Sequence, residues 1–198
     1  METIRGRTSR ELDVNELKEQ LTNYNHIHLD LGTGDGRYAR TLASRHPDWF
    51  IIGMDSCREN LRERSQAPLQ NLLFVIASAQ DLPRGLQGRV SRLTINFPWG
   101  SLLGSLLAGD PRLMDGLECI SRPAASVELR LNGGALAEAG TTLDAGTDAI
   151  CHNLQRTGWR VSTPVSVDAR GLREFPSTWA RRLAFGRDPR AMMLCAHK

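Results

Sequence analysis

The chain has 198 residues, and its length, composition and charge already narrow the possibilities. A hydrophobic fraction of 40% and a charged fraction of 24% are ordinary for a globular protein, which excludes a disordered or collagen-like chain. The net charge is only +3, but residues 11–155 carry −5, whereas residues 156–198 hold nine basic and three acidic residues. Such a basic segment is either a solvated tail or a surface that binds a polyanion.

The cysteines and the N-terminus favour a cytoplasmic protein. Cys57, Cys119, Cys151 and Cys195 are far apart and show no metal-site spacing, so we expect reduced thiols and no metal. The first residues lack the apolar segment of a signal peptide, and no apolar run is long enough to span a membrane. We therefore expect a monomer in the cytoplasm that has no membrane contact.

Helical and strand patterns alternate along the chain. Asp13 and Glu16 form a capping-box pattern at the start of the first predicted helix. We predict seven strands, over 27–31, 49–54, 71–77, 91–97, 126–131, 159–168 and 191–196. Helices are predicted over 13–23, 37–45, 58–65 and 146–157, and one or two more over 100–121. A Gly- and Ala-rich loop follows the strand over 126–131, and an Arg-rich connection over 169–190 precedes the last strand. The alternation predicts an α/β fold with a mostly parallel sheet, in one domain over 1–198 with an N-terminal extension over 1–25.

The sharpest motif is the glycine turn after the first predicted strand, which reads HLDLGTGDG over 28–36. Gly32 and Gly34 allow a tight bend and a close approach of the backbone to a ligand. The spacing is GxGxG, and position 37 is Arg, so the GxGxxG fingerprint of dinucleotide binding is not met. Asp55 ends the next strand, where nucleoside-binding folds place a carboxylate for the ribose hydroxyls.

An Asp two residues before GxGxG and an acid after the second strand resemble the pattern of class I methyltransferases, which use S-adenosylmethionine (SAM). The resemblance implies a Rossmann-like fold whose mostly parallel, seven-stranded sheet is flanked by helices. Asp30 would then hold the methionine amino end and Asp55 the ribose, while Gly32 and Gly34 admit the cofactor to the backbone. The backbone near Ala79 and Gln80 would border the adenine ring.

Two tryptophans stand in segments that favour a role in binding. Trp99 follows a predicted strand within FPWGSLL, over 97–103, and Trp179 lies within PSTWARRLAFGR, over 176–187. Ligands of α/β folds bind at the carboxyl ends of the strands. Two indoles on loops there could hold a flipped base, since each stacked base contributes about 1–3 kcal/mol.

Three segments together resemble one specific family. DLGTGDGR over 30–37, FPWGSLL over 97–103 and SxWAxRLAFGR over 177–187 resemble the 16S rRNA adenine-N1 methyltransferases of the Kam/Npm type, which confer aminoglycoside resistance. The resemblance implies that a methyl group passes from SAM to N1 of the adenine at ribosomal position 1408 in the 30S subunit, leaving S-adenosylhomocysteine (SAH).

The same resemblance assigns roles to single residues. Trp99 and Trp179 would sandwich the adenine, and Ser177 would position Trp179 and approach the cofactor. Ser101 would contact the methionine part of the cofactor, and Asn96 is placed at the cofactor site as well. The arginines expected to contact RNA, most of them in an RNA-binding linker over 169–190, are Arg58, Arg62, Arg64, Arg181, Arg182, Arg187 and Arg190.

The chain departs from the family pattern at three places, and alternatives stay open. The linker between the second and third strands is short, the loop over 132–148 is acidic, and Asp188 interrupts the basic run. The segment from Asn96 to Trp99 also resembles the motif of exocyclic amino methyltransferases, so N6-adenine methylation is an alternative. Another RNA-base methyltransferase, a small-molecule methyltransferase and a non-catalytic ribosome-assembly binder are the others.

Overall fold

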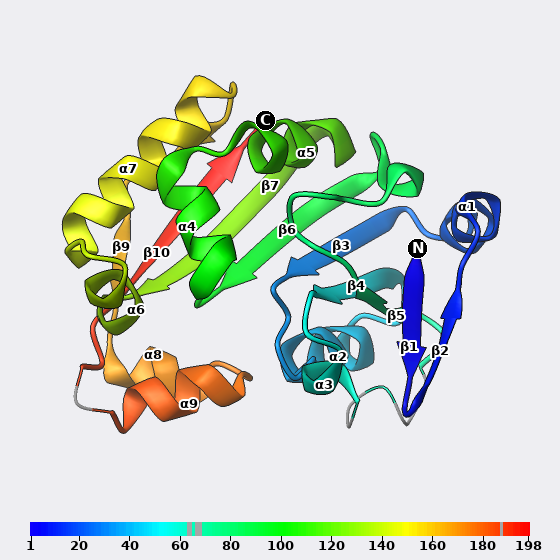
Figure 1. Ribbon diagram of the computed structural model, residues 1–198, viewed down its shortest axis with the longest axis horizontal. Coiled ribbons are helices and arrows are strands. Elements are labelled where there is room, and N and C mark those ends of the chain that lie inside the picture. The colour runs from blue at the N-terminus through cyan, green and yellow to red at the C-terminus, as the bar shows by residue number, and fades with distance from the viewer. Residues whose placement is uncertain (63–64, 66–68, 187) are drawn as a thin grey trace.

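One sheet runs through the part of the chain that this computed structural model describes, residues 1–62, 65, 69–186 and 188–198. Its strand order is β2-β1-β5-β4-β3-β6-β7-β10-β8, and β9 pairs with β10 (Figure 1). The strands are β1 (Glu2–Arg5), β2 (Thr8–Glu11), β3 (His26–Leu31), β4 (Trp49–Asp55), β5 (Leu72–Ile76), β6 (Val90–Asn96), β7 (Ser121–Asn132), β8 (Arg160–Val161), β9 (Val165–Val167) and β10 (Ala191–His197). The central strands β5, β4, β3, β6 and β7 are parallel, so their carboxyl ends share one edge of the sheet.

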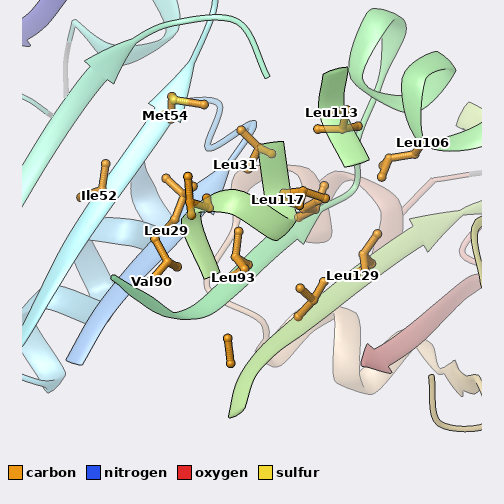
Figure 2. Close-up of a cluster of buried hydrophobic side chains, with 14 of the residues drawn as sticks. Leu29, Leu31, Ile52, Met54, Val90, Leu93, Leu106, Leu113, Leu117 and Leu129 are labelled. Carbon is orange, nitrogen blue, oxygen red and sulfur yellow. The ribbon is translucent and has the colours of Figure 1, made fainter. Parts of the chain in front are cut away.

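Helices cover the sheet (Figure 1). The side chains of each strand alternate between its two faces. The helices are α1 (Val14–Thr22), α2 (Arg37–Arg45), α3 (Arg58–Leu61), the 3-10 helix η1 (Arg84–Leu86), α4 (Gly100–Ala108), α5 (Pro111–Ile120), α6 (Gly133–Glu138), α7 (Leu143–Arg156), α8 (Ala169–Glu174) and α9 (Thr178–Ala184). Leu29, Ile52 and Leu93 join the largest apolar cluster, with leucines of α1, α4, α5 and α7. Figure 2 shows this cluster at the leucines of α4 and α5. Ile51 and Phe74 pack with α2 and α3 in a second cluster.

The predicted helices and strands are largely present in the structure. The capping box of α1 is confirmed, since the Asp13 side chain accepts the Glu16 N–H and the Glu16 carboxylate accepts the Asp13 N–H at 3.2 Å. The Asp13 carboxylate also accepts the Asn15 N–H at 2.7 Å. The continuous apolar sequence of β4 follows from the burial of that strand on both faces. The predicted fold class, a mostly parallel sheet flanked by helices, is confirmed.

Among the described residues the sheet has ten strands in place of the seven that we predicted. Two differences account for the three additional strands. The N-terminal extension forms a hairpin, β1–β2, which turns at Gly6 with a φ of +64° and pairs with β5. The strand predicted over 159–168 is divided into β8 and β9, with Pro164 between them, and proline cannot donate a hydrogen bond to a ladder.

Two segments predicted as loops are helical. Asn132 caps α6 within the Gly- and Ala-rich segment, because its side chain accepts the Ala135 N–H at 2.8 Å. The Arg-rich connection contains α8 and α9, so Trp179 lies in the first turn of a helix and not on a loop. Of the helix predicted over 58–65, the structure contains α3, over Arg58–Leu61. Residues 63 and 64 lie outside the described part of the chain. Among the described residues, no helix has the length and apolar character that a membrane span requires.

Two glycines provide a matched test of this packing. A methyl group added at Gly53 in β4 would lie 2.8 Å from the Phe74 ring and 3.2 Å from the Ala39 Cβ. We expect Gly53→Ala to lower the free energy of unfolding by about 1–3 kcal/mol because the site is already filled. Gly104 in α4 has no neighbouring atom within 4 Å of the added methyl group, so Gly104→Ala should raise it by about 0.5–1 kcal/mol. Denaturant titration measures both, and equal effects would contradict this packing.

Candidate active site

A cavity of about 440 Å³ opens at the carboxyl ends of the parallel strands. Its wall combines the glycine turn after β3, the ends of β4 and β6, and the segment after β5. The lining residues are Leu31, Gly32, Gly34, Met54, Asp55, Ser56, Asn60, Ala77, Ser78, Ala79, Asn96, Phe97, Pro98, Trp99, Ser101, Leu102 and Trp179. This volume lies within the range of small-molecule sites, about 300–1,000 Å³.

The glycine turn has a backbone that other residues adopt only with strain. Gly32, Gly34 and Gly36 have φ values of +71°, +58° and +73°. A Cβ on Gly32 would lie 2.7 Å from the Leu102 side chain, which leaves no room for any larger residue. The turn is fixed to the next strand, because the N–H groups of Gly32 and Thr33 both donate to the Met54 carbonyl, at 2.8 and 3.0 Å.

Asp55 connects the glycine turn to the end of β4. Its Oδ2 accepts the Gly34 N–H at 2.8 Å, and its Oδ1 accepts the Cys57 N–H at 2.8 Å. A carboxylate has about four acceptor positions, so both oxygens keep capacity toward the cavity that Asp55 lines. This arrangement fits a ligand with adjacent hydroxyl groups, such as the ribose of a nucleoside.

Asp30 lies beneath the cavity and is 1% exposed. Its Oδ2 accepts the Thr33 hydroxyl, and its Oδ1 accepts the Thr94 hydroxyl at 2.7 Å and the Asn96 Nδ2 at 3.0 Å. Burial raises the pKa of Asp30 to about 6, although these three hydrogen bonds act in the opposite direction. The structure therefore places Asp30 behind Asn96 and the glycine turn, and not on the cavity wall as its predicted contact with the methionine amino end requires.

The polar layer under the cavity continues along the same face of the sheet. Thr94 gives its proton to Asp30, so the Nε2 of His28 must be the donor in its 2.9 Å contact with Thr94. Burial lowers the pKa of His28 to about 3, so this ring is neutral at pH 7. On the other side, the Asn96 Oδ1 accepts the Arg130 guanidinium at 2.9 Å.

Two indoles face each other at the mouth of the cavity. The ring centroids of Trp99 and Trp179 lie 6.0 Å apart, and the ring planes are 19° from parallel. Each side chain lines the cavity and remains 44–45% exposed, which is unusual for tryptophan unless it binds something. The Arg182 guanidinium lies 5.4 Å from the centroid of Trp179, a cation–π distance.

Most of the predicted cavity residues meet at this site. Gly32, Gly34, Asp55, Ala79, Asn96, Trp99, Ser101 and Trp179 all line the cavity. Gln80 does not, since its amide donates to the Ser105 hydroxyl at 2.7 Å. Ser177 is the N-cap residue of α9 without a side-chain cap bond and is not among the lining residues either.

The predicted RNA-binding arginines fall into three groups. Arg62, Arg181 and Arg182 are exposed. Arg58 bonds to Glu2 and Ser9 and so fixes the N-terminal hairpin, and Arg190 forms two 2.8 Å bonds with Asp188. Arg64 and Arg187 lie outside the described residues.

Several lining residues were not found from the sequence. Ser56 and Ser78 lie within two residues of the ends of β4 and β5, whereas Asn60 and Leu102 lie on α3 and α4, the helices that follow β4 and β6. The signal that the sequence offers for these residues is their position after a strand end. Among the described residues, no group of three or more His, Cys, Asp or Glu side chains is arranged to hold a metal ion.

Comparison with known proteins agrees with this geometry. The family model of NpmA, a 16S rRNA (adenine(1408)-N(1))-methyltransferase, matches residues 2–198. A 16S rRNA (adenine(1408)-N(1))-methyltransferase of Escherichia coli is 29% identical over 93% of this chain and 92% of its own length. The crystal structure of the 16S rRNA methyltransferase KamB aligns with a TM-score of 0.89 at 27% identity, covering 100% of this chain and 99% of that one. A variant of such an enzyme from Catenulisporales acidiphilia, solved with its cosubstrate SAM, aligns with a TM-score of 0.83 at 25% identity, covering 100% and 96%.

The sheet order, the glycine-lined cavity and these relatives define the class, which is that of the SAM-dependent class I methyltransferases. Within that class, the chain belongs to the family of 16S rRNA (adenine(1408)-N(1))-methyltransferases. The family resemblance seen in the sequence and the predicted cofactor are thereby confirmed.

The two buried groups that flank Thr94 should affect stability with opposite pH dependence. The folded-state pKa of Asp30 is raised from 3.8 to about 6, so folding binds a proton and the contribution of Asp30 falls as pH rises through that window, by about 3 kcal/mol. The folded-state pKa of His28 is lowered from 6.5 to about 3, so its contribution is lost as pH falls through that window. Unfolding free energies of wild type, Asp30→Asn and His28→Gln at several pH values test this. For each variant, the difference in unfolding free energy from wild type is followed as a function of pH. If this difference changed in the same direction with pH for both variants, the prediction would be wrong.

Proposed function

We propose that this enzyme methylates N1 of adenine 1408 in 16S rRNA within the 30S subunit, and that Trp99 and Trp179 hold the flipped adenine. The observation that carries the proposal is the near-parallel pair of exposed indoles at the mouth of the glycine-lined cavity. A base between two aromatic rings is the recurring way to hold a nucleotide out of its stack. Because the substrate is the ribosome, we place the enzyme in the cytoplasm and expect it to act as a monomer.

Adenine N1 carries a lone pair at neutral pH and needs no general base. SAM, when bound, supplies the electrophilic methyl group. The cavity fits this cofactor, since Asp55 offers carboxylate acceptors for a ribose, and Gly32 and Gly34 leave the wall free of side chains. The remaining task of the protein is to unstack the base, orient it and exclude water, which is catalysis by positioning.

The two indoles are about 1 Å closer than a stacked base requires. Aromatic carbons pack at about 3.5 Å, so a ring between two others needs about 7 Å, and the centroids lie 6.0 Å apart. Entry of the adenine therefore separates Trp99 and Trp179 slightly. Methylation at N1 makes the base cationic, and an indole face stabilises a nearby positive charge by about 0.5–2 kcal/mol.

The structure favours N1 over the alternative N6 position. In exocyclic amino methyltransferases an Asn carbonyl accepts the target amine. Here the Asn96 Oδ1 already accepts the Arg130 guanidinium, and its Nδ2 donates to Asp30. Both polar atoms of Asn96 thus already have a scaffold partner, and its Oδ1 keeps one of its two lone pairs for a further donor.

The proposed product explains a resistance phenotype. A methyl group at N1 adds bulk and positive charge to the base edge with which cationic aminoglycosides pair. Purified enzyme should transfer labelled methyl to 30S subunits and poorly to free rRNA, and the product should stop reverse transcriptase. Its expression in a susceptible bacterium should raise tolerance to kanamycin and apramycin. Equal transfer to small molecules, or N6-methyladenosine in the modified rRNA, would overturn the proposal.

The indole pair provides the most direct test by substitution. We expect Trp99→Ala and Trp179→Ala each to lower kcat/KM on 30S subunits by about one to two orders of magnitude, because a stacked base loses about 1–3 kcal/mol. SAH affinity, measured by calorimetry, should change little. Trp49→Ala is the matched control, since Trp49 begins β4 at the opposite edge and stacks on His46. Full activity of both variants would refute the base-holding role.

The arginines differ in how freely they can contact phosphate. Arg182 is exposed beside Trp179, so Arg182→Ala should weaken 30S binding and reduce the slope of log affinity against log salt concentration by about 1. Arg190 is already paired with Asp188, so Arg190→Ala should have a smaller effect. Filter binding at several salt concentrations measures both. Equal slopes in wild type and Arg182→Ala would exclude Arg182 from the RNA contact.

A further inference from the structure

We propose that Thr178 is a positioning residue that couples the cofactor cavity to the base-holding indole, through its hydrogen bond to Asp35. This inference rests on the function proposed above and deepens it. Asp35 lies inside the glycine turn, and Thr178 directly precedes Trp179. One hydrogen bond thus joins the two halves of the site.

The contact is short and links two distant parts of the chain. The Thr178 hydroxyl donates to the Asp35 Oδ2 at 2.6 Å, across 143 residues. The other carboxylate oxygen of Asp35 accepts the Arg37 N–H at 3.1 Å, at the start of α2. Hydrogen bonds to a charged partner are about twice as strong as neutral ones, so this bond is a substantial restraint on the first turn of α9.

A second observation places the indole next to the turn, at a distance that one added carbon atom would bridge. A Cβ on Gly34 would lie 4.0 Å from the Trp179 Cδ1, which is ordinary contact distance. Gly34 also donates its N–H to Asp55 on the cavity wall. A ligand that orders Gly34 and Asp55 therefore also orders the residues that contact Trp179.

Thr178 completes the anchoring of the α8–α9 segment. The preceding residues are held from the other side, because Phe175 stacks on Tyr38 at 4.8 Å and the Arg130 guanidinium lies 4.2 Å from the Phe175 ring centroid. That contact fixes the segment to the sheet and to α2. Only the Thr178 bond fixes α9 to the glycine turn itself, within the described hydrogen bonds.

This geometry requires reciprocal coupling between the two ligands. If the cofactor orders the turn and the turn orders Trp179, the bound cofactor strengthens base capture, and a bound 30S subunit strengthens cofactor binding by the same factor. We expect SAH to bind wild type at least about fivefold more tightly when the enzyme is on 30S subunits than when it is free.

Thr178→Val removes the hydroxyl and keeps the shape. We expect it to bring the ratio of SAH affinities on and off the ribosome to about 1, and to lower kcat on 30S subunits about tenfold. SAH affinity of the free enzyme should stay within about twofold of wild type, and Thr178→Ser should restore both quantities. Thr41→Ala is the control, because the Thr41 hydroxyl donates at 2.8 Å to the Arg37 carbonyl in its own helix.

The outcomes separate this inference from the proposed function. A wild-type ratio of 1, an unchanged ratio in Thr178→Val, or a similar loss of SAH affinity with and without 30S subunits would overturn the coupling while methylation of N1 stands. A wild type that does not methylate N1 in 30S subunits would overturn the proposed function and the coupling with it. Thr178→Ala provides the same test should the valine variant be unstable in thermal melting.

Discussion

The site is organised around one carboxylate that is removed from water. An ionised carboxylate in the interior is tolerated only where donors surround it, and Asp30 has three, from Thr33, Thr94 and Asn96. These donors come from the glycine turn and from the neighbouring strand β6, so satisfying Asp30 fixes how the two lie relative to each other. The cavity between the glycine turn and the end of β6 results from this fixed arrangement. Burial still outweighs the three bonds, since the pKa of Asp30 is raised to about 6.

The same requirement explains why a helical segment covers this part of the sheet. Strand residues on the opposite face are apolar, whereas His28, Thr94 and Arg130 make the face above Asp30 polar. His28 and Asp30 are each 1% exposed, so this polar layer is closed against water, and α8 and α9 lie near the ends of β6 and β7 (Figure 1). Phe175 is the closing side chain, since it contacts Phe97 and Tyr38 and lies under the Arg130 guanidinium. The network that satisfies Asp30 thus also supports the segment that carries Trp179.

Local patterns could be predicted from the sequence, and distant pairings could not. The capping box at Asp13, the apolar strand β4 and the glycine turn are each written within a few neighbouring residues, and each was found. The helices α8 and α9 were missed because their dominant signal was charge. Arg58 pairs with Glu2, which is 56 residues away in the chain, so no local pattern indicates this ion pair. The partner of Arg190 is Asp188, only two residues away, and Asp188 is visible in the sequence as the acid that interrupts the basic run. The bond between Asp35 and Thr178 spans 143 residues, so no spacing rule could indicate it.

The partition of the arginines bears on how the proposed target is selected. With Arg58 and Arg190 paired within the protein, Arg181 and Arg182 on α9 offer exposed positive charge next to the indoles. Contacts with phosphate position a protein on RNA but carry no base identity. Stacking between two indoles does not distinguish one base from another either, since every base has a flat face to stack on. If the enzyme acts as proposed, selection of one adenine must therefore come from where the folded RNA places that base relative to α9, and not from a short RNA sequence.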